Sequence, residues 1–405
     1  MSLAVHAPQH RRLVLVIAFS DLGRDPRVNR QLRALVPGYQ VVAAGFADPG
    51  VPGVQFIHVE WPGAGKVASR VRNVPRRLVR EARLNLGSLL PHDLRASAYE
   101  GLYWSSTLVA DCLSKLSQLR PDVVIANDID ALPLALRVAS GAPVIFDAHE
   151  YAPREYDNSR TFRMRIEPYR RYLGARYIPM AAAMTTVCRG VADSYEADTG
   201  VRSIIITNAP AYEPLRPFLP GDEAPIRMVH HGMGAPVRKI ENMIRMMEHL
   251  DQRFVLDFML VPSPARYVRR LEDMAAGDGR IRFRPLVPMR ELARATNAYD
   301  IGLFLLEPTN FNYLHALPNK FFEFIQARLA IAIGPSPEMA ALVRRHDLGV
   351  VAPDFSPKAL AARLRSVTRD QITAWKRNAD VVAKELSAEN NALILQDLVR
   401  RVSER

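Results

Sequence analysis

Two groups of residues have the types and spacing of an anion-binding site. The first is the loop GMGAPVRK at 232–239, which follows a predicted strand and precedes a predicted helix. Its glycines, Gly232 and Gly234, permit close approach to the backbone, and a helix start carries partial positive charge. Arg238 and Lys239 place two cations where a helix start disfavours them, unless an anion neutralises them. The pattern favours a diphosphate site, with two solvated side chains as the alternative.

The second group lies in the stretch LPNKFFEFIQARLAIAIG at 317–334. Pro318 ends the preceding segment, and Asn319 has a side chain that can cap the predicted helix. Lys320 and Glu323 are three residues apart, so they share one face of that helix. Lys320 would add a third cation to the site, and the carboxylate of Glu323 suits a cis-diol such as ribose. The alternative is a surface ion pair on a half-buried helix.

Polar residues also follow apolar strands in the first half of the chain. Open α/β sheets bind ligands at the carboxyl ends of their strands, so these residues are candidates for a ligand-facing edge. They are Asp21, Arg24 and Arg27 after the first strand, Asn127 and Asp128 after the fourth, and Asp147, His149 and Glu150 at the end of the fifth. For His149, a structural role is the alternative.

Apolar runs alternate with helical patterns, which predicts an α/β protein with two Rossmann-like, doubly wound domains. Seven strands are expected up to about residue 207. Asp25 and Pro26 predict the start of the first helix, and a helix of about 20 residues is expected to end near Leu119. The first loop, SDLGRDP, lacks the GxGxxG pattern, so a dinucleotide site has no motif support.

A proline-rich stretch at 207–225 separates the two halves. The strand pattern then restarts, with strands expected at 226–231, 254–260, 280–283, 301–306, 329–333 and near 348–353. We predict an N-terminal, acceptor-binding domain at 1–210 and a C-terminal, donor-binding domain at 211–370, facing each other across a cleft. Residues 371–405 are expected to form a helical tail that returns toward the N-terminal domain.

The charge and composition limit the class of protein. The 405 residues carry a net charge of +12, with 48% apolar and 24% charged residues, which is typical of a globular protein. The segment 66–95 is basic and amphipathic, which suits an anionic membrane surface; a solvated helical face is the alternative. It has no aromatic residues for base stacking, and no nucleic-acid-binding module is recognisable, so nucleic acid is not an expected partner.

The two cysteines, Cys112 and Cys188, lack metal-ligand spacing and are predicted to be buried thiols in a reducing compartment. The N-terminal sequence has no secretory signal pattern, and no apolar run approaches the roughly 20 residues of a membrane-spanning helix. These features predict a cytoplasmic location, with peripheral attachment to the inner face of the cell membrane through residues 66–95 as a further hypothesis.

Four segments resemble the GT-B glycosyltransferases, in particular the retaining, family 4-like transferases of bacterial polysaccharides and lipid-linked sugars. They are FDAHE at 146–150, GMGAPVRK at 232–239, PNKFFEF at 318–324 and IGPSPEM at 333–339. The resemblance extends over essentially the whole chain. It implies a hexosyltransferase that moves a sugar from a nucleotide-sugar donor to a glycan, lipid-linked or natural-product hydroxyl. It also implies retained anomeric configuration, no cofactor and no metal ion.

The resemblance also implies roles for individual residues. Catalytic roles fall to His149, Arg238 and Lys239; donor binding to Gly232, Gly234, Asn319, Lys320 and Glu323; and the acceptor side to Asp21, Arg24 and Glu150. Arg238 and Lys239 are expected at the donor pyrophosphate and Glu323 at the ribose. The chain departs from the family at His315, where the first acid of the family's carboxylate pair is expected.

Two other functions remain open at this stage. A sugar-nucleotide epimerase has the same architecture and would need acids in the N-terminal half, where Asp128, Asp147 and Glu150 are candidates. A catalytically degenerate GT-B protein that serves as a membrane-bound scaffold is the non-enzymatic alternative, and His315 in place of the acid favours it.

Overall fold

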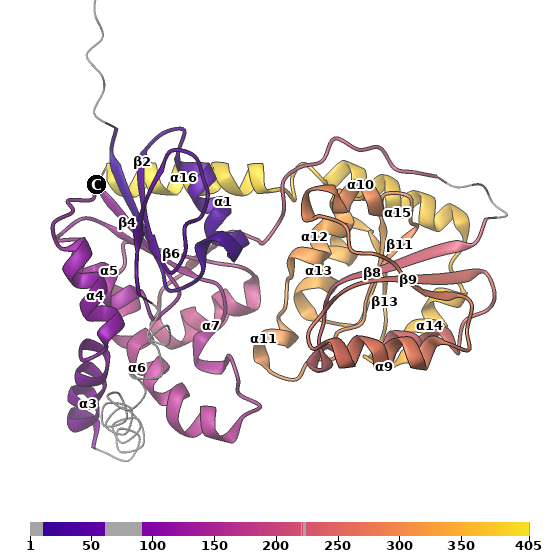
Figure 1. The fold of residues 1–405 in the computed structure, drawn as a ribbon, viewed down its shortest axis with the longest axis horizontal. Coiled ribbons are helices and arrows are strands. Elements are labelled where there is room, and N and C mark those ends of the chain that lie inside the picture. The colour runs from indigo at the N-terminus through magenta and orange to yellow at the C-terminus, as the bar shows by residue number, and fades with distance from the viewer. Residues whose placement is uncertain (1–10, 61–90, 220, 222–223, 405) are drawn as a thin grey trace, which may run out of the picture. The chain divides into compact units, whose positions relative to one another are not determined.

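The computed structural model describes residues 11–60, 91–219, 221 and 224–404. Its contacts divide the chain into two compact units (Figure 1). The described residues up to 187 belong to the first unit, together with 191–206 and 392–405. The second unit holds 188–190 and 207–391. Most of the basic segment 66–95 lies outside the described residues.

The first unit contains the seven predicted strands in one parallel sheet, ordered β3-β2-β1-β4-β5-β6-β7. Their near-continuous apolar sequences are those of strands buried on both faces. The order is that of a Rossmann fold with one added strand. The strands are β1 (Leu13–Ala18), β2 (Gln40–Gly45), β3 (Val54–His58), β4 (Val123–Asn127), β5 (Val144–Ala148), β6 (Ala183–Thr186) and β7 (Ser203–Ile205).

The helices linked to this sheet confirm one sequence prediction and correct another. The Asp25 side chain accepts hydrogen bonds from two backbone amides at the start of α1, where Pro26 is the first residue. The single long helix predicted to end near Leu119 is two helices, because Ser106 is extended and interrupts it. The helices are α1 (Pro26–Leu35), α3 (His92–Trp104), α4 (Thr107–Leu116), α5 (Leu132–Val138), α6 (Glu167–Tyr177), α7 (Arg189–Thr199) and α16 (Ala388–Ser403).

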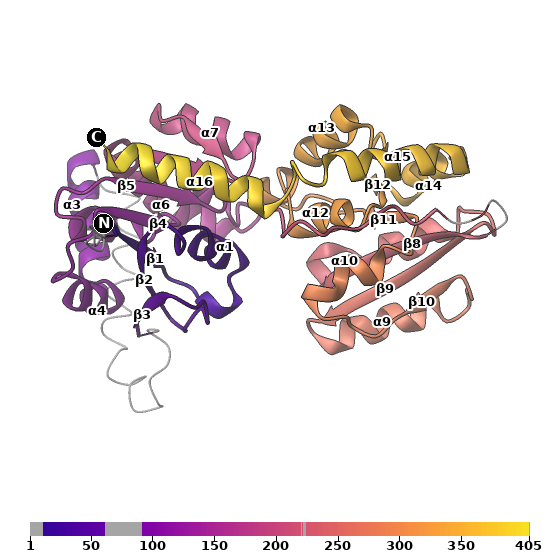
Figure 2. The same ribbon diagram turned by 90° about the horizontal axis from the view of Figure 1, so that it is seen from above.

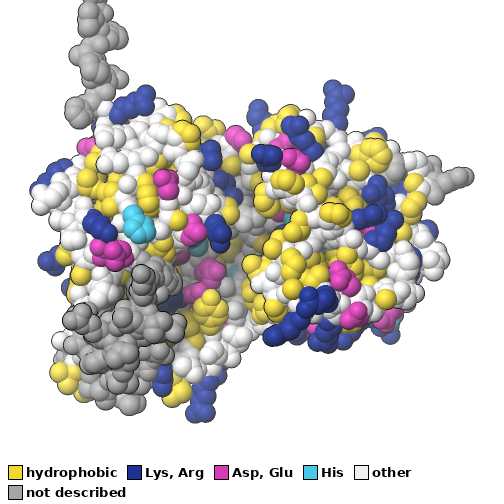
Figure 3. Space-filling model, in the orientation of Figure 1, with side chains coloured by type: hydrophobic (Ala, Val, Ile, Leu, Met, Phe, Trp, Pro, Cys, Tyr) yellow, Lys and Arg dark blue, Asp and Glu magenta, His cyan; other side chains and the backbone are white. Residues whose placement is uncertain are grey.

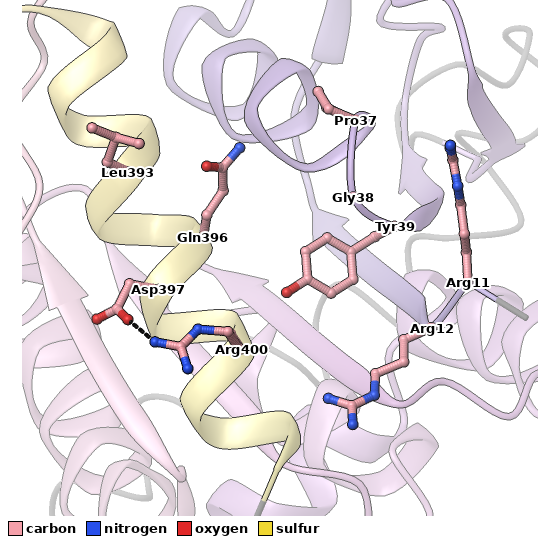
Figure 4. Close-up of a pocket in the computed structure, with 9 residues that line it drawn as sticks. All are labelled: Arg11, Arg12, Pro37, Gly38, Tyr39, Leu393, Gln396, Asp397 and Arg400. Atoms are coloured by element: carbon pink, nitrogen blue, oxygen red, sulfur yellow. Dashed lines mark hydrogen bonds and ion pairs between the residues drawn. The ribbon is translucent and has the colours of Figure 1, made fainter. Parts of the chain in front are cut away.

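The end of the chain packs on the first sheet through α16, whose Leu395, Leu398 and Val399 join the core around β1 and α1. A pocket of about 730 Å³ opens along this contact (Figure 4). In it, Arg12 donates to the Ser403 hydroxyl and Arg400 pairs with Asp397, each at 2.5 Å. The pocket lies at the amino ends of β1 and β2, whereas open α/β sheets bind ligands at the carboxyl ends of their strands. We therefore interpret it as part of the packing contact between α16 and the first sheet.

The second unit contains six parallel strands in the order β10-β9-β8-β11-β12-β13. Figure 2 shows β10, β9, β8, β11 and β12 following one another across this sheet. This is again the Rossmann order, and it confirms the predicted pair of doubly wound domains. Helices cover both faces, with α9 and α14 on one and α10, α12 and α15 on the other (Figure 1). The strands are β8 (Ile226–Gly234), β9 (Phe254–Pro262), β10 (Ile281–Phe283), β11 (Ile301–Phe304), β12 (Ala330–Ile333) and β13 (Gly349–Val351).

Two details of the second unit differ from the sequence predictions. Pro318 occupies the N-cap position of α12, so Asn319 is the first helical residue and its side chain does not cap the helix. A four-residue helix, α11, was not predicted. The helices are α8 (Glu241–Met247), α9 (Ala265–Ala275), α10 (Leu292–Thr296), α11 (Phe311–Leu314), α12 (Asn319–Gln326), α13 (Pro337–His346), α14 (Pro357–Arg365) and α15 (Arg369–Val382).

Surface and burial properties agree with the composition. Lys and Arg side chains are spread over the visible face of both units (Figure 3). Cys112 and Cys188 are both buried free thiols. Within the described part of the chain, no helix combines the length and the apolar character that a membrane span requires.

A fully buried arginine, Arg328, fastens the proline-rich linker to the second unit. Its guanidinium donates to the backbone carbonyls of Gln326 at 2.6 Å and Glu213 at 2.7 Å, and it pairs with Asp380 at 2.7 Å. It also lies over the Tyr212 ring, 5.3 Å from the centroid. The linker therefore has a fixed anchor, although its described residues form no helix or strand.

Arg328→Met is expected to speed amide hydrogen exchange around Tyr212 and Glu213 and to destabilise the second unit by about 2–4 kcal/mol. The substitution leaves two carbonyls and a carboxylate without their buried partner. Arg294→Met is the matched control, because Arg294 contacts the same Glu213 but is 65% exposed. Equal exchange rates in both variants would contradict the anchor.

Candidate functional site

The strongest site lies in the second unit, where the carboxyl ends of β8 and β11 meet the start of α12. Lys320 projects from α12 and is only 5% exposed. Its amine lies 3.0 Å from Nε2 of His230 and 4.4 Å from the centroid of the Phe304 ring. The burial contradicts the alternative of a surface Lys320–Glu323 pair, since Glu323 is 8% exposed.

The hydrogen bonds fix the roles of this histidine and lysine. His230 Nδ1 lies 2.8 Å from the Leu303 carbonyl oxygen, which can only accept, so Nδ1 carries the proton. In the neutral ring, Nε2 is then an acceptor, and the Lys320 amine donates to it. Burial, followed by the charge of Lys320, lowers the pKa of His230 well below its usual value and keeps it neutral.

Arg238 and Lys239 stand between β8 and α8, as predicted, but in different electrostatic situations. Lys239 forms an ion pair with Glu307 at 2.8 Å, and both side chains are about 40% exposed. Arg238 forms no ion pair with any described residue. Burial lowers the pKa of Arg238. Burial, followed by the charge of Arg238, lowers the pKa of Lys320 well below its usual value. Arg238 and Lys320 are therefore neighbouring basic side chains without a carboxylate at ion-pair distance.

Glu323 lies behind these cations and faces a second histidine. Its carboxylate is 3.6 Å from Nδ1 of His231. Burial lowers the pKa of His231 to about 3, so this histidine is neutral near pH 7 and does not balance the carboxylate charge. Its Nε2 atom is buried without a hydrogen-bond partner. Glu323 thus faces a neutral histidine and lies near the basic side chains of Lys320 and Arg238.

Glycine is favoured at the two loop positions for different structural reasons. Gly232 has a φ of +115°, and a Cβ there would lie 3.3 Å from Cε of Lys320. A Cβ at Gly234 would lie 2.7 Å from Cγ2 of Val268, so Gly234 allows close packing against α9. Only Gly232 borders the lysine side chain directly.

Gly232→Ala is expected to destabilise the protein by about 1–3 kcal/mol and to weaken nucleotide binding, because a Cβ strains the backbone and presses on Lys320. Gly277→Ala, where the space around the Cβ position is open, serves as the control. Thermal unfolding and calorimetric titration measure the two effects. Unchanged nucleotide affinity in Gly232→Ala would show that the lysine position does not depend on this glycine.

His315, which replaces the expected acid, has a carboxylate beside it from another element. Its Nδ1 lies 3.0 Å from Oε1 of Glu338, the second residue of α13. The Phe311 ring packs on the imidazole with centroids 4.5 Å apart. The IGPSPEM turn thus supplies an acid next to the position where the carboxylate pair is incomplete.

In the first unit, the end of β5 holds a buried ion pair. Asp147 is 1% exposed and forms two hydrogen bonds with the Arg27 guanidinium, at 2.6 and 2.7 Å. Gln31 and Thr185 also donate to its carboxylate, each at 2.5 Å. Burial opposes the charge of this carboxylate, but Arg27 outweighs it and holds the pKa of Asp147 well below its usual range. Arg27 is therefore part of the core and does not face a ligand.

His149 lies among oxygen atoms of the chain itself. Nε2 is 3.0 Å from Oδ1 of Asn127 and 3.3 Å from Asp147, and Nδ1 is 3.4 Å from Asp128. Burial opposes the positive charge, but Asp128 and Asp147 together raise the pKa of His149. The surroundings thus favour the imidazolium, which can donate a proton or stabilise negative charge but is not a base.

The acceptor-side candidates lie at the same edge but do not form one cluster. Desolvation of its carboxyl group, with the charges of Glu155 and Asp128, raises the pKa of Glu150 to about 7. Asp21 and Arg24 lie after β1, 3.7 Å apart, and Arg24 is 90% exposed. No contact between this pair and Glu150 is found in the described part of the chain.

Sequence reasoning missed the residues that surround Lys320. His230, His231 and Glu307 were not candidates, although HH directly before a glycine loop is a visible signal at a strand end. Glu307 lies in a loop, and spacing gives no indication that it contacts Lys239. The arrangement can hold a diphosphate at Lys320 and Arg238, with a carboxylate behind them.

Comparisons with known proteins show which family and which solved structures the chain resembles. Residues 74–209 match the sequence model of Glycosyltransferase Family 4. The chain is similar to sucrose-phosphate synthase from Thermosynechococcus elongatus, with a TM-score of 0.71 and 12% identity over 97% of this chain and 99% of the other. HepE from Anabaena, solved with UDP, has a TM-score of 0.66 and 12% identity over 96% and 100% of the two chains. No curated protein sequence matches the chain.

A glycosyltransferase from Rickettsia africae also has this fold, with a TM-score of 0.65 and 11% identity over 97% of this chain and 98% of that one. The two α/β units of the chain thus have the GT-B fold that the sequence predicted. The family 4 match in the first half agrees with it. Together they show a GT-B fold and a first half that is similar to Glycosyltransferase Family 4.

Proposed function

We propose that the protein transfers a hexose from a nucleotide-sugar donor to a hydroxyl of a glycan or lipid-linked acceptor, with retained anomeric configuration and no metal ion. The observation that carries this proposal is the pair of basic side chains, Lys320 and Arg238, without a carboxylate at ion-pair distance beside the glycine loop of β8. Positive charge on either side chain is costly in a largely buried place, and a bound diphosphate removes that cost.

These residues match the demands of the reaction. When the bond between the sugar and the diphosphate breaks, negative charge accumulates on the leaving group. The amine of Lys320 and the guanidinium of Arg238 are placed to stabilise it, and Lys239 adds charge when its pairing with Glu307 opens. Glu323 accepts hydrogen bonds from the ribose hydroxyls. For the first unit, His149 is proposed as a catalytic residue, and Asp128 and Asp147, which raise its pKa, favour the role of a proton donor.

The proposed donor and the proposed acceptor rest on different kinds of evidence. HepE has been solved with UDP-glucose, which makes a uridine nucleotide the first donor to test. The acceptor class rests on the resemblance of the sequence motifs to polysaccharide and lipid-linked-sugar transferases. Peripheral attachment to an anionic membrane through residues 66–95 belongs to the same proposal and rests on the charge of that segment.

Hydrolysis of the donor tests the reaction without knowledge of the acceptor. The protein is incubated with UDP-glucose or GDP-mannose in EDTA, and the released sugar is followed by proton NMR before it mutarotates. The α-anomer is expected to appear first from an α-linked donor. Release of the β-anomer would contradict retention, and strict dependence on added metal would contradict the metal-free proposal.

A further inference from the structure

The amine of Lys320 is buried without a counter-ion, which raises the question of its charge before a ligand binds. Four titratable side chains face it from the elements packed around it. They are His230 and His231 on β8, Arg238 in the loop that follows, and Glu323 one turn along α12. From β11 it meets the ring of Phe304. Within the described residues, no carboxylate lies within ion-pair distance of this amine.

These neighbours favour the neutral amine. An ammonium ion loses most of its hydration in this position, where only 5% of the side chain is exposed. Arg238 adds a like charge. Burial and Arg238 together lower the pKa of Lys320 well below its usual value, and Glu323 offsets this only in part. His230 offers a lone pair but no charge, because its Nδ1 proton is held by the Leu303 carbonyl.

A diphosphate reverses this balance. Its negative charges next to the amine stabilise the ammonium form, as an opposite charge within a few ångströms does for any titratable group. We propose that binding of a diphosphate-bearing donor takes up one proton from solvent, and that Lys320, positioned by His230, receives it. The inference rests on the proposed function, since it concerns the same donor site. The step forms one N–H bond from –NH₂ and a solvent proton, and breaks no bond in the donor.

Proton uptake has a consequence for affinity. Above the pKa of the empty site, each increase of one pH unit is expected to weaken donor binding by about tenfold, because one proton is bound with each ligand. His230 Nε2, 3.0 Å from the amine, can accept a hydrogen bond from both the amine and the ammonium form, so we expect Lys320 to keep its place when it is protonated. The cation is thereby created where the leaving-group charge develops.

The experiment is calorimetric titration of the full chain with UDP-glucose at pH 8, in HEPES and in Tris, whose ionisation enthalpies differ. UDP-glucose is used because its phosphate diesters do not titrate near this pH, unlike the terminal phosphate of UDP. The difference in observed heat gives the number of protons taken up. We expect a value approaching one for the natural protein.

Four variants test which group receives the proton. Lys320→Arg carries a permanent charge, so it is expected to bind UDP-glucose with uptake close to zero. If that variant misfolds, Lys320→Met serves instead, with weakened binding and no uptake. Lys376→Met removes another buried lysine of the same unit and is expected to leave the uptake unchanged, since the amine of Lys376 bonds to the Tyr299 carbonyl. His230→Gln is expected to change both the uptake and the pH profile of binding.

The outcomes separate this inference from the proposed function. Binding without proton uptake in the natural protein overturns the inference and leaves the proposed function standing. Uptake that persists in Lys320→Arg shows that another group receives the proton and also overturns it. Absence of binding to UDP-glucose and GDP-mannose by folded protein overturns both.

Discussion

Lys320→Met is expected to weaken the binding of the nucleotide-sugar donor by about 10- to 150-fold. The substitution removes a charge-assisted hydrogen bond to the diphosphate, worth roughly 1.5–3 kcal/mol. Because the methionine is similar in length and uncharged, it fits a site that already disfavours the ammonium ion. Calorimetric titration of both proteins with the same donor measures the change, and Arg238→Met is expected to have an effect of similar size.

The matched control is Lys376→Met. Lys376 is also fully buried in the second unit, and burial lowers its pKa to about 8. Its amine bonds to the backbone at Tyr299, before the start of β11, which is the edge opposite the donor site. We therefore expect donor affinity close to that of the natural protein. Equal losses in the two variants would show that general destabilisation, and not the position of Lys320, explains the effect.

Asp147→Ala is expected to lower the free energy of unfolding of the first unit by about 3–5 kcal/mol. The substitution leaves the guanidinium of Arg27, which is 6% exposed, without its buried carboxylate. Urea unfolding followed by circular dichroism measures the change. Arg27→Met/Asp147→Leu removes both charges and is expected to recover part of the loss, since it leaves no unpaired ion. A double variant as unstable as the sum of the single ones would contradict the coupling.

Asp147 also predicts the direction in which the stability of the first unit changes with pH. Arg27 depresses the pKa of Asp147 in the folded protein, below the value of about 3.9 for an unfolded aspartate. Its contribution to stability is therefore complete above about pH 4 and is lost as the pH falls through the folded-state pKa. Asp147→Ala is expected to lose stability less steeply in acid than the natural protein.

The fold could be predicted from sequence because its strands have an unambiguous signal. Runs such as LVLVIA at β1 and AIAI at β12 are apolar throughout, as strands buried between helices must be. The break between α3 and α4 gave a weaker signal, since Ser106 is a common residue in helices as well as at their ends. The predicted N-cap residue of α12, Asn319, was wrong by one position, because Pro318 takes the extended conformation that precedes the helix.

The residues of the candidate site could be singled out from the sequence, whereas their electrostatic surroundings could not. The loop glycines, Arg238, Lys320 and Glu323 were singled out from residue types alone. Burial of Lys320 could not be read from the sequence, because it depends on how β8, β11 and α12 pack around the side chain. The same applies to His230 and to the ion pair between Lys239 and Glu307, which join residues far apart in the chain. Spacing identifies candidates, whereas protonation states require the neighbours.

Calorimetric titration with nucleotides is the most direct test of the proposed donor site in the second unit. The purified chain is titrated calorimetrically with UDP and GDP and with UDP-glucose and GDP-mannose, and its folding is verified by circular dichroism. We predict one saturable site that prefers one of the two bases and is weakened in Lys320→Met and Glu323→Ala. Folded protein that binds none of the four, or that binds equally well after both substitutions, would contradict the assignment of this site.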